Sequence, residues 1–228
     1  MGNKIKLAIS GGAGRMGTAI WNLALADSDF EVAVVLERLV HPLMSSDASQ
    51  IEKADVLIEF TAPEATIDHL NYALKYQKPM VIGTTGLNEE QIKLIKEASE
   101  EIPILFSPNM SIGINVLFSI IPGLAKKLSG WDIEIVEVHR KAKKDAPSGT
   151  AKKFAQLISQ VTGKEIPAHS LRVGDVAGDH TITFAGEGER IEISHRAQSP
   201  ILFAKGALIL TKKLIKMPPG LYEPVDFL

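Results

Sequence analysis

The feature that most constrains the fold of this chain is a run of three glycines directly after its first apolar segment. Gly11, Gly14 and Gly17 follow the apolar residues 5–10 at G-x-x-G-x-x-G spacing, and the helical pattern of residues 16–26 begins inside this run. A strand that turns tightly into a helix, without side chains in the way, presents the helix N-terminus to a pyrophosphate. The arrangement therefore predicts a dinucleotide site at the end of the first strand.

An acidic residue stands where such a site needs one. Glu37 lies 20 residues beyond Gly17 and follows the apolar residues 31–36. A carboxylate at this position accepts hydrogen bonds from the ribose hydroxyls of adenosine, whereas the next residue, Arg38, can pair with a 2′-phosphate. The sequence thus permits both NADH and NADPH. The alternative is a surface ion pair after a glycine-rich turn, which does not explain why strand, glycines, helix and acid occur together.

Short apolar runs continue to alternate with helical stretches through the first half of the chain. The apolar runs are residues 55–60, 79–82 and 104–106, and residues 67–76 and 89–100 have helical spacing. Strands that are apolar on both faces are typical of parallel sheets covered by helices. We therefore expect a doubly wound parallel α/β sheet.

Two loops of this expected sheet follow strand ends, where doubly wound sheets bind their ligands. They are residues 60–63 and 83–86. Each loop by itself is more often an ordinary connection. In series with the glycine turn, they are candidate walls for ribose and nicotinamide.

The pattern changes after Gly130. Residues 132–139 read as a long strand in which Ile133, Ile135, Glu137 and His139 share one face. A helix is expected to begin near Ser148 and to stop at Gly163, and residues 115–128 also look helical and buried. Further strands are expected in the ranges 171–173, 181–185 and 190–194, the last two joined as an antiparallel hairpin.

The domain boundary is placed in the turn-rich residues 107–111. A last helix, residues 203–216, is expected to return to the first domain. We therefore assign residues 1–110 and 201–228 to a dinucleotide-binding domain, and residues 111–200 to a second domain.

Composition narrows the function classes. The 228 residues contain no cysteine, which excludes disulfides, cysteine-rich zinc sites and thiol nucleophiles, and no metal site is expected. A formal net charge of −2 gives no reason to expect a nucleic-acid or anionic membrane partner. Without a signal pattern in residues 1–6, or an apolar run of about 18 residues, a cytoplasmic location is the expectation.

Basic residues gather at the end of the long strand. His139, Arg140 and Lys143 precede the expected helix start at Ser148-Gly149-Thr150. A lysine and the N–H groups of a helix N-terminus together bind carboxylates. A solvated basic face beside a capped helix would explain the lysines equally well, although it has no need of His139.

The segment 134–151, EIVEVHRKAKKDAPSGTA, resembles the signature of the dihydrodipicolinate reductases. The resemblance extends to Arg15-Met16-Gly17, Glu37-Arg38, residues 83–86, residues 108–111 and Arg172-Val-Gly-Asp, and so covers nearly the whole chain. It implies a Rossmann-like doubly wound parallel sheet plus a second α+β domain with an open mixed sheet, used for substrate binding and oligomerisation. It also implies a homotetramer.

The resemblance further implies NAD(P)H-dependent reduction of 4-hydroxy-tetrahydrodipicolinate (dihydrodipicolinate) to tetrahydrodipicolinate, in lysine biosynthesis by the diaminopimelate pathway. His139 would donate the proton, Lys143 would stabilise substrate charge, and Gly149 and Thr150 would bind a carboxylate of this small dicarboxylate. The implied cofactor-binding residues are Gly11, Gly12, Ala13, Gly14, Arg15, Met16, Glu37, Arg38, Gly83, Thr84, Thr85, Pro108, Asn109, Met110 and Ser111.

One residue departs from the family pattern. Arg140 stands where the family usually has a second histidine. Its guanidinium can bind a carboxylate through two hydrogen bonds but cannot share a proton near neutral pH. Because a dicarboxylate needs cations at both ends, we favour a substrate-binding Arg140 that points into the pocket over one that faces solvent.

Two other classes of oxidoreductase on the same architecture need residues that this chain lacks. Thioacyl semialdehyde dehydrogenases need a cysteine, and short-chain dehydrogenases need a lysine four residues after a tyrosine, which none of the three tyrosines has. The alternative from another class is a non-catalytic protein that senses nicotinamide nucleotides. Such a sensor has no use for an acid beside an anion pocket.

Overall fold

The chain forms two compact units in a computed structural model that describes residues 3–38 and 43–228. The first unit comprises the described residues up to Ser111 together with Phe203–Leu228, and the second comprises Ile112–Leu202. The C-terminal segment therefore returns to the unit in which the chain begins.

The first unit is built on a six-stranded parallel sheet. Its strands are β1 (Ile5–Ser10), β2 (Phe30–Leu36), β3 (Val56–Glu59), β4 (Met80–Ile82), β5 (Pro103–Phe106) and β10 (Gly220–Tyr222). They lie in the order β10-β5-β4-β3-β1-β2, and each neighbouring pair is parallel. Strands β3 and β4 are buried along their whole length, as expected for strands with helices on both faces.

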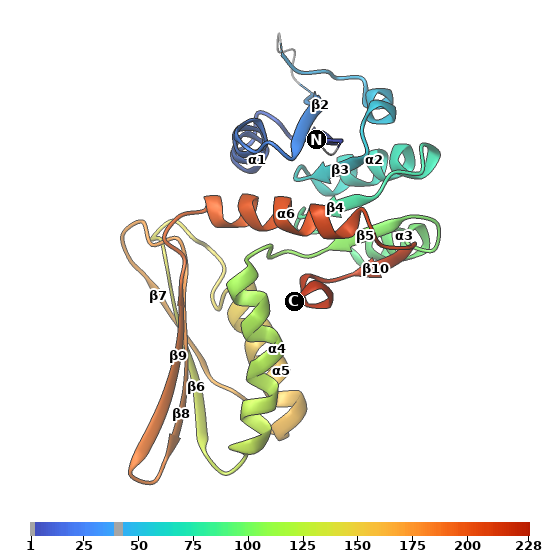
Figure 1. Ribbon diagram of the computed structural model, residues 1–228. Coiled ribbons are helices and arrows are strands. Elements are labelled where there is room, and N and C mark those ends of the chain that lie inside the picture. The colour runs from blue at the N-terminus through green and yellow to red at the C-terminus, as the bar shows by residue number, and fades with distance from the viewer. Residues whose placement is uncertain (1–2, 39–42) are drawn as a thin grey trace. The chain divides into compact units, whose positions relative to one another are not determined.

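Helices cover both faces of this sheet. They are α1 (Arg15–Ala26), α2 (Pro63–Lys75), α3 (Glu89–Ala98) and α6 (Ile201–Leu214), with short 3₁₀ segments η1 (Ala48–Lys53) and η2 (Pro224–Phe227). Figure 1 shows α1 and α6 on one side of the sheet and α2 and α3 on the other. One core layer joins Leu57 and Ile82 of the sheet to Leu70 of α2 and Ile95 of α3.

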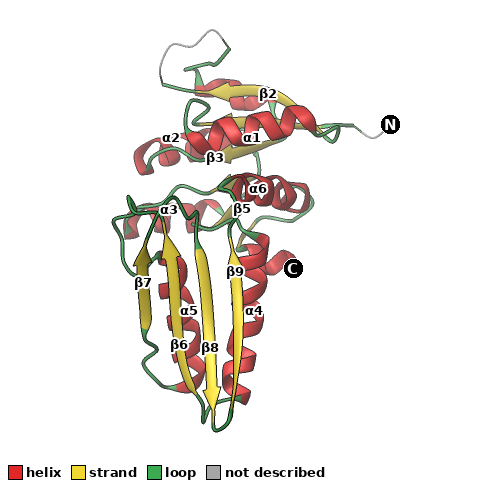
Figure 2. Cartoon of the chain, turned by 90° about the vertical axis from the view of Figure 1, so that its left-hand side faces the viewer, coloured by secondary structure: helices red, strands yellow, loops and turns green. Residues whose placement is uncertain are grey.

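The second unit has a four-stranded mixed sheet. Its elements are α4 (Ile112–Lys127), β6 (Asp132–His139), α5 (Gly149–Thr162), β7 (Ala168–Arg172), β8 (Asp179–Gly186) and β9 (Glu189–Arg196). The strand order is β7-β6-β8-β9, with β6 parallel to β7 and antiparallel to β8. Helices α4 and α5 pack on one face of this sheet, as Figures 1 and 2 show, and Phe118 and Phe154 join them.

Local chemistry sets the ends of α5, the helix closest to the candidate chemistry. Ser148 is its N-cap, and the Ser148 hydroxyl accepts a hydrogen bond from the N–H of Ala151. Gly163 ends the helix in the left-handed conformation, with a φ of 69°. The expected start near Ser148 and stop at Gly163 are both confirmed.

The expected fold class is confirmed, and so is the hairpin of β8 and β9. Alternation along β6 also holds, because Ile133, Ile135 and Glu137 are all buried on the covered face. Strand β10 was missed. Its three residues, Gly-Leu-Tyr, follow two prolines and carry no periodicity, so only the neighbouring β5 makes them a strand.

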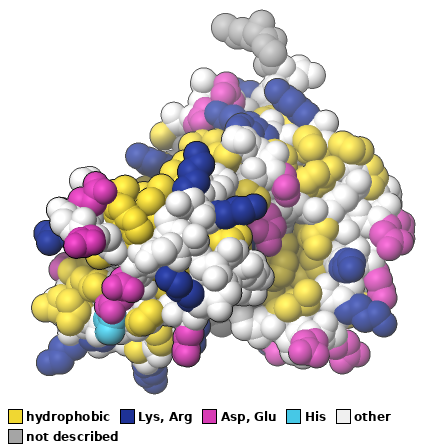
Figure 3. Space-filling view, turned by 90° about the horizontal axis from the view of Figure 1, so that it is seen from below, with side chains coloured by type: hydrophobic (Ala, Val, Ile, Leu, Met, Phe, Trp, Pro, Cys, Tyr) yellow, Lys and Arg dark blue, Asp and Glu magenta, His cyan; other side chains and the backbone are white. Residues whose placement is uncertain are grey.

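The face of the molecule drawn in Figure 3 carries no dominant charge. Figure 3 shows one face on which lysine, arginine and carboxylate side chains are interspersed with apolar ones, in keeping with the formal net charge of −2. In the described part of the chain, no helix has the length and apolar character needed to cross a membrane.

Two helical glycines give opposite expectations for stability. A Cβ on Gly206 of α6 would lie 1.8 Å from the carbonyl oxygen of Met110, whereas a Cβ on the exposed Gly123 of α4 would meet nothing within 4 Å. We expect Gly206→Ala to lower the free energy of unfolding by about 1–3 kcal/mol, the usual effect of overpacking. Gly123→Ala, the matched control, should raise it by about 0.5–1 kcal/mol because the unfolded chain loses freedom. Denaturant titrations measure both, and equal effects would contradict this packing.

Candidate active site

The glycine turn of the first unit has the close backbone contacts that its motif predicts. Gly11 has a φ of 81°, in the left-handed region, and a Cβ there would lie 2.7 Å from the carbonyl oxygen of Phe60. A Cβ on Gly17 would lie 2.0 Å from the carbonyl oxygen of Gly11. Gly14 is the N-cap of α1 and brings no side chain to it. Residues 11–17 therefore form a bare backbone cradle at a helix N-terminus.

Glu37 joins this cradle to the end of β2. Its Oε2 accepts a hydrogen bond of 3.0 Å from the N–H of Ala13, and its Oε1 accepts one of 2.8 Å from the N–H of Arg38. A groove of about 1320 Å³ opens here, lined among others by Gly11, Ala13, Gly14, Glu37 and Arg38. A groove with a bare cradle and a carboxylate near it fits a dinucleotide, with negative phosphates at the helix N-terminus and ribose at the acid.

One wall of the groove was not anticipated from the sequence. Helix α2 contributes Asp68, His69, Tyr72 and Lys75 to the lining. His69 also reaches the sheet, where its Nδ1 lies 2.7 Å from Oε2 of the fully buried Glu59. Which face of α2 meets a ligand depends on how the helix packs, so helical spacing alone gave no signal for these residues.

The remaining predicted cofactor residues lie at strand and helix ends of the same unit. Gly12 lies in the glycine turn, and Arg15 and Met16 begin α1. Thr84 follows β4 and is buried, and its hydroxyl accepts a hydrogen bond of 3.2 Å from the N–H of Thr61, so the two candidate loops contact each other. Within the described residues, the groove lining includes neither Gly83–Thr85 nor Pro108–Ser111.

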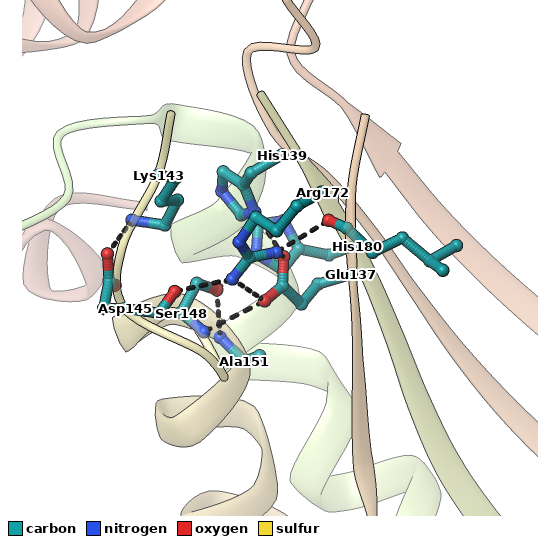
Figure 4. Close-up of polar contacts among 9 residues, drawn as sticks. Glu137, His139, Lys143, Asp145, Ser148, Ala151, Arg172 and His180 are labelled. Atoms are coloured by element: carbon teal, nitrogen blue, oxygen red, sulfur yellow. Dashed lines mark hydrogen bonds and ion pairs between the residues drawn. The ribbon is translucent and has the colours of Figure 1, made fainter. Parts of the chain in front are cut away.

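In the second unit, the predicted proton donor contacts a buried acid. His139 ends β6, and its Nδ1 contacts Oε2 of Glu137, two residues earlier on the same face (Figure 4). Glu137 is fully buried. Its Oε1 accepts hydrogen bonds from Arg172 Nη2 at 2.7 Å and from the N–H of Ser148 at 3.1 Å, and its Oε2 accepts one from Arg172 Nη1 at 2.8 Å.

The hydrogen-bond donors around Glu137 decide its charge. Burial alone raises the pKa of a carboxyl, but the hydrogen bonds that Glu137 accepts, above all those from Arg172, outweigh it and lower the pKa of Glu137 to about 2. The carboxyl is therefore ionised at neutral pH, and it can only accept hydrogen bonds.

A second histidine borders the first. The ring of His180, from β8, meets the His139 ring edge to face at 5.2 Å between centroids, and its Nε2 lies 3.1 Å from Oγ of Ser148. Burial, followed by the neighbouring His139, lowers the pKa of His180 to about 4. His180 is therefore neutral near pH 7.

The other predicted residues of this site follow in the loop and helix after β6. Lys143 Nζ lies 2.8 Å from Oδ1 of Asp145, while Gly149 and Thr150 begin α5. Arg140 is exposed just after the strand. The structure thus brings His139, Lys143 and the start of α5 together at the carboxyl end of β6 (Figure 4).

Sequence reasoning assigned no role to Glu137, Arg172 or His180. The alternation of β6 placed Glu137 on the face of His139, and this was the one available signal. Arg172 and His180 lie 35 and 43 residues beyond Glu137, on strands whose pairing with β6 only the fold reveals.

Comparisons with known proteins agree with this arrangement. The family model described as dihydrodipicolinate reductase, N-terminus, matches residues 5–110, and the model described as dihydrodipicolinate reductase, C-terminus, matches residues 113–228. The chain is 44% identical to the 4-hydroxy-tetrahydrodipicolinate reductase of Caldanaerobacter subterraneus subsp. tengcongensis, with 97% of each chain covered. It is 34% identical to the enzyme of the same name from Syntrophus aciditrophicus, with 98% of each covered.

Solved structures show the same fold. A dipicolinate-bound dihydrodipicolinate reductase from Paenisporosarcina sp. TG-14 superposes with a TM-score of 0.87 at 24% identity, covering 99% of this chain and 100% of that one. An aspartate dehydrogenase from Thermotoga maritima is more distant, with a TM-score of 0.56 at 14% identity, covering 96% of this chain and 100% of that one.

The neutral His180 should make stability depend on pH. Its pKa is about 4 in the folded chain and 6.5 when unperturbed, so the unfolded chain binds the proton more readily. Stability is therefore present above pH 6.5 and is lost as pH falls through this window, by at most about 3 kcal/mol. His180→Gln, which keeps an acceptor for Ser148, should flatten this part of the profile in denaturant titrations.

His169→Gln is the matched control, because it removes an exposed histidine from the same sheet. It should leave the loss of stability between pH 6.5 and about 4 in place. Identical profiles for wild type and His180→Gln would contradict a neutral, buried His180.

Proposed function

The chain belongs to the dihydrodipicolinate reductase family, and from this premise we propose how its residues divide the reaction. It is an NAD(P)H-dependent oxidoreductase that reduces 4-hydroxy-tetrahydrodipicolinate to tetrahydrodipicolinate in the diaminopimelate route to lysine. The matches span both units, and they favour this enzyme over a nucleotide sensor. The residue roles below are our proposal.

The cradle at α1 and the acid at β2 would hold the nucleotide. Gly11–Gly14 would receive the pyrophosphate on backbone N–H groups, with Gly12, Arg15 and Met16 completing the turn. Glu37 would accept hydrogen bonds from the ribose hydroxyls, and Arg38 would contact a 2′-phosphate when one is present. The loops Gly83–Thr85 and Pro108–Ser111, which the groove lining does not include in the described chain, would contact the nicotinamide half. A bound nicotinamide nucleotide supplies a hydride.

The chain's own residues would bind the dicarboxylate and supply the proton. The first turn of α5, at Gly149 and Thr150, would bind one carboxylate on its N–H groups, and Arg140 would bind the other. Lys143 would exchange its contact with Asp145 for the substrate and offset the negative charge that develops on its ring. The substrate would lose its 4-hydroxyl group as water to give a conjugated imine, and His139 would donate the proton that completes the reduction of this imine.

The observation that carries this proposal is the placement of His139, Lys143 and the start of α5 at one end of the mixed sheet. We also propose, from the family resemblance, that the enzyme is a homotetramer. The sheet of the second unit supports an assembly, because its uncovered face exposes Val136 and Leu171. A cytoplasmic location stays a prediction from the sequence.

Removing either proposed catalytic side chain should abolish most of the activity. We expect His139→Ala and Lys143→Ala each to lower kcat by about a hundredfold or more, the usual scale for a positioned acid or charge stabiliser. Nucleotide affinity should persist, because the cradle lies in the other unit. Nicotinamide oxidation, followed by absorbance with freshly made substrate, measures kcat. Lys144→Ala, at an exposed lysine next to Lys143, is the control, and wild-type turnover in His139→Ala would exclude the proposed role.

Substitutions at the two residues after β2 should weaken the binding of NADH and of NADPH to different extents. Glu37→Ala should weaken NADH binding selectively, since ribose hydrogen bonds are lost, and Arg38→Ala should weaken NADPH binding selectively, since a phosphate contact is lost. Titration of each variant with both nucleotides measures the four dissociation constants. Each variant serves as the control for the other, and parallel losses for both cofactors would contradict the assignment.

A further inference from the structure

Glu137 is a buried charge that the proposed reaction does not use. Its side chain has no exposed surface, yet it is ionised and receives three hydrogen bonds besides its contact with His139, two from Arg172 and one from the N–H of Ser148. Burying a carboxylate is costly unless every oxygen is paired, and a hydrophobic side chain would fill the same place at less cost. The arrangement therefore calls for a reason beyond stability.

The hydrogen bonds leave one protonation pattern for His139. A carboxylate has no proton to donate, so the contact between Glu137 Oε2 and His139 Nδ1 requires the proton on Nδ1. Arg172 and the N–H of Ser148 hold the carboxylate from the other sides at 2.7 to 3.1 Å, so it cannot rotate away. The nitrogen that remains for proton exchange is Nε2.

Space is kept open next to this nitrogen. Gly178 lies beside it, and a Cβ on Gly178 would come within 2.9 Å of His139 Nε2. The glycine thus leaves the proton-exchanging atom uncrowded, while the His180 ring packs edge to face against the His139 ring. Both neighbours belong to the same unit as His139.

We propose that Glu137, clamped by Arg172 and the Ser148 backbone, is the positioning residue that keeps a proton on His139 Nδ1, so that the protonated ring donates its second proton from Nε2 and is left as the Nδ1–H tautomer. This inference rests on the proposed function of His139. Glu137 touches no reacting atom in this scheme and acts only through the histidine. The same logic of an acid orienting a histidine operates in hydrolase triads, where it sets the tautomer rather than relaying a proton.

The first test uses the wild-type protein and needs no variant to fold. Nitrogen-15 NMR of histidine-labelled protein, with the His139 signals assigned by their loss in His139→Gln, reports which ring nitrogen carries a proton. As the pH is raised until the ring holds a single proton, we expect Nε2 to lose its proton and Nδ1 to keep it. Retention of the proton on Nε2 would overturn the proposal.

The second test is Glu137→Gln, which keeps the shape and removes the charge. In wild type, Oε1 of Glu137 faces two donors, Arg172 Nη2 and the N–H of Ser148. Because only an oxygen can accept from both, the amide oxygen of the glutamine should take this position. The amide NH₂ then faces His139 Nδ1 and keeps that nitrogen unprotonated, so the ring is held as the neutral Nε2–H tautomer, which is a far weaker acid than the doubly protonated ring. We expect kcat to fall by about a hundredfold or more, with little change in the substrate KM or in nucleotide affinity. A purely structural role would leave the tautomer unchanged.

The matched control is Glu134→Gln on the same strand. Glu134 also pairs with a histidine, at 3.0 Å from Nε2 of His169, but both side chains are more than half exposed. This variant should keep wild-type kcat and the wild-type His139 tautomer. If Glu137→Gln folds and keeps wild-type kcat while His139→Ala is inactive, this inference is wrong and the proposed function stands. If His139→Ala is active, the proposed function itself is wrong.

Discussion

The ion pair between Glu137 and Arg172 is the interaction on which the second unit's site depends. The register of the parallel strands β6 and β7 places Arg172 beside His139, from where its guanidinium reaches both oxygens of Glu137. Its Nη2 also donates to the carbonyl oxygen of Asp145, at 2.6 Å, while the N–H of Ser148 donates to Glu137. One buried charge and its arginine partner thus fix the His139 ring, the loop at Asp145 and the start of α5. Breaking such a pair typically costs about 3–5 kcal/mol, so position and stability are coupled here.

In the proposed function each unit binds an anion at a helix N-terminus, and the two helices begin differently. Helix α1 begins at a bare glycine turn, where a side chain would collide with neighbouring backbone, so a bulky pyrophosphate can approach closely. Helix α5 begins with a serine cap that contacts His180, five residues after Lys143 in the sequence. A small carboxylate needs less room and gains from a point charge nearby. Under the proposed assignment, the two helix starts therefore differ as the sizes of their anions do.

Much of this fold could be predicted because its signals are local. Apolar runs with helical segments between them specify a parallel sheet, the glycine spacing specifies a turn at a helix N-terminus, and Ser148 and Gly163 mark both ends of α5. Alternation along β6 placed Glu137 and His139 on one face. Strand β10 and the α2 wall of the groove were missed, because each acquires its role from a partner distant in sequence.

The sequence by itself therefore determined the family, the glycine cradle and the identity of the candidate acid, since these are encoded by spacing within one segment. Only the tertiary structure decided what surrounds that acid. Arg172 and His180 reach His139 through strand pairing across 33 and 41 residues of chain, and pairing register is a property of the assembled sheet. The charge of Glu137, the neutrality of His180 and the tautomer inferred for His139 all follow from burial and from these distant partners, which no local pattern contains.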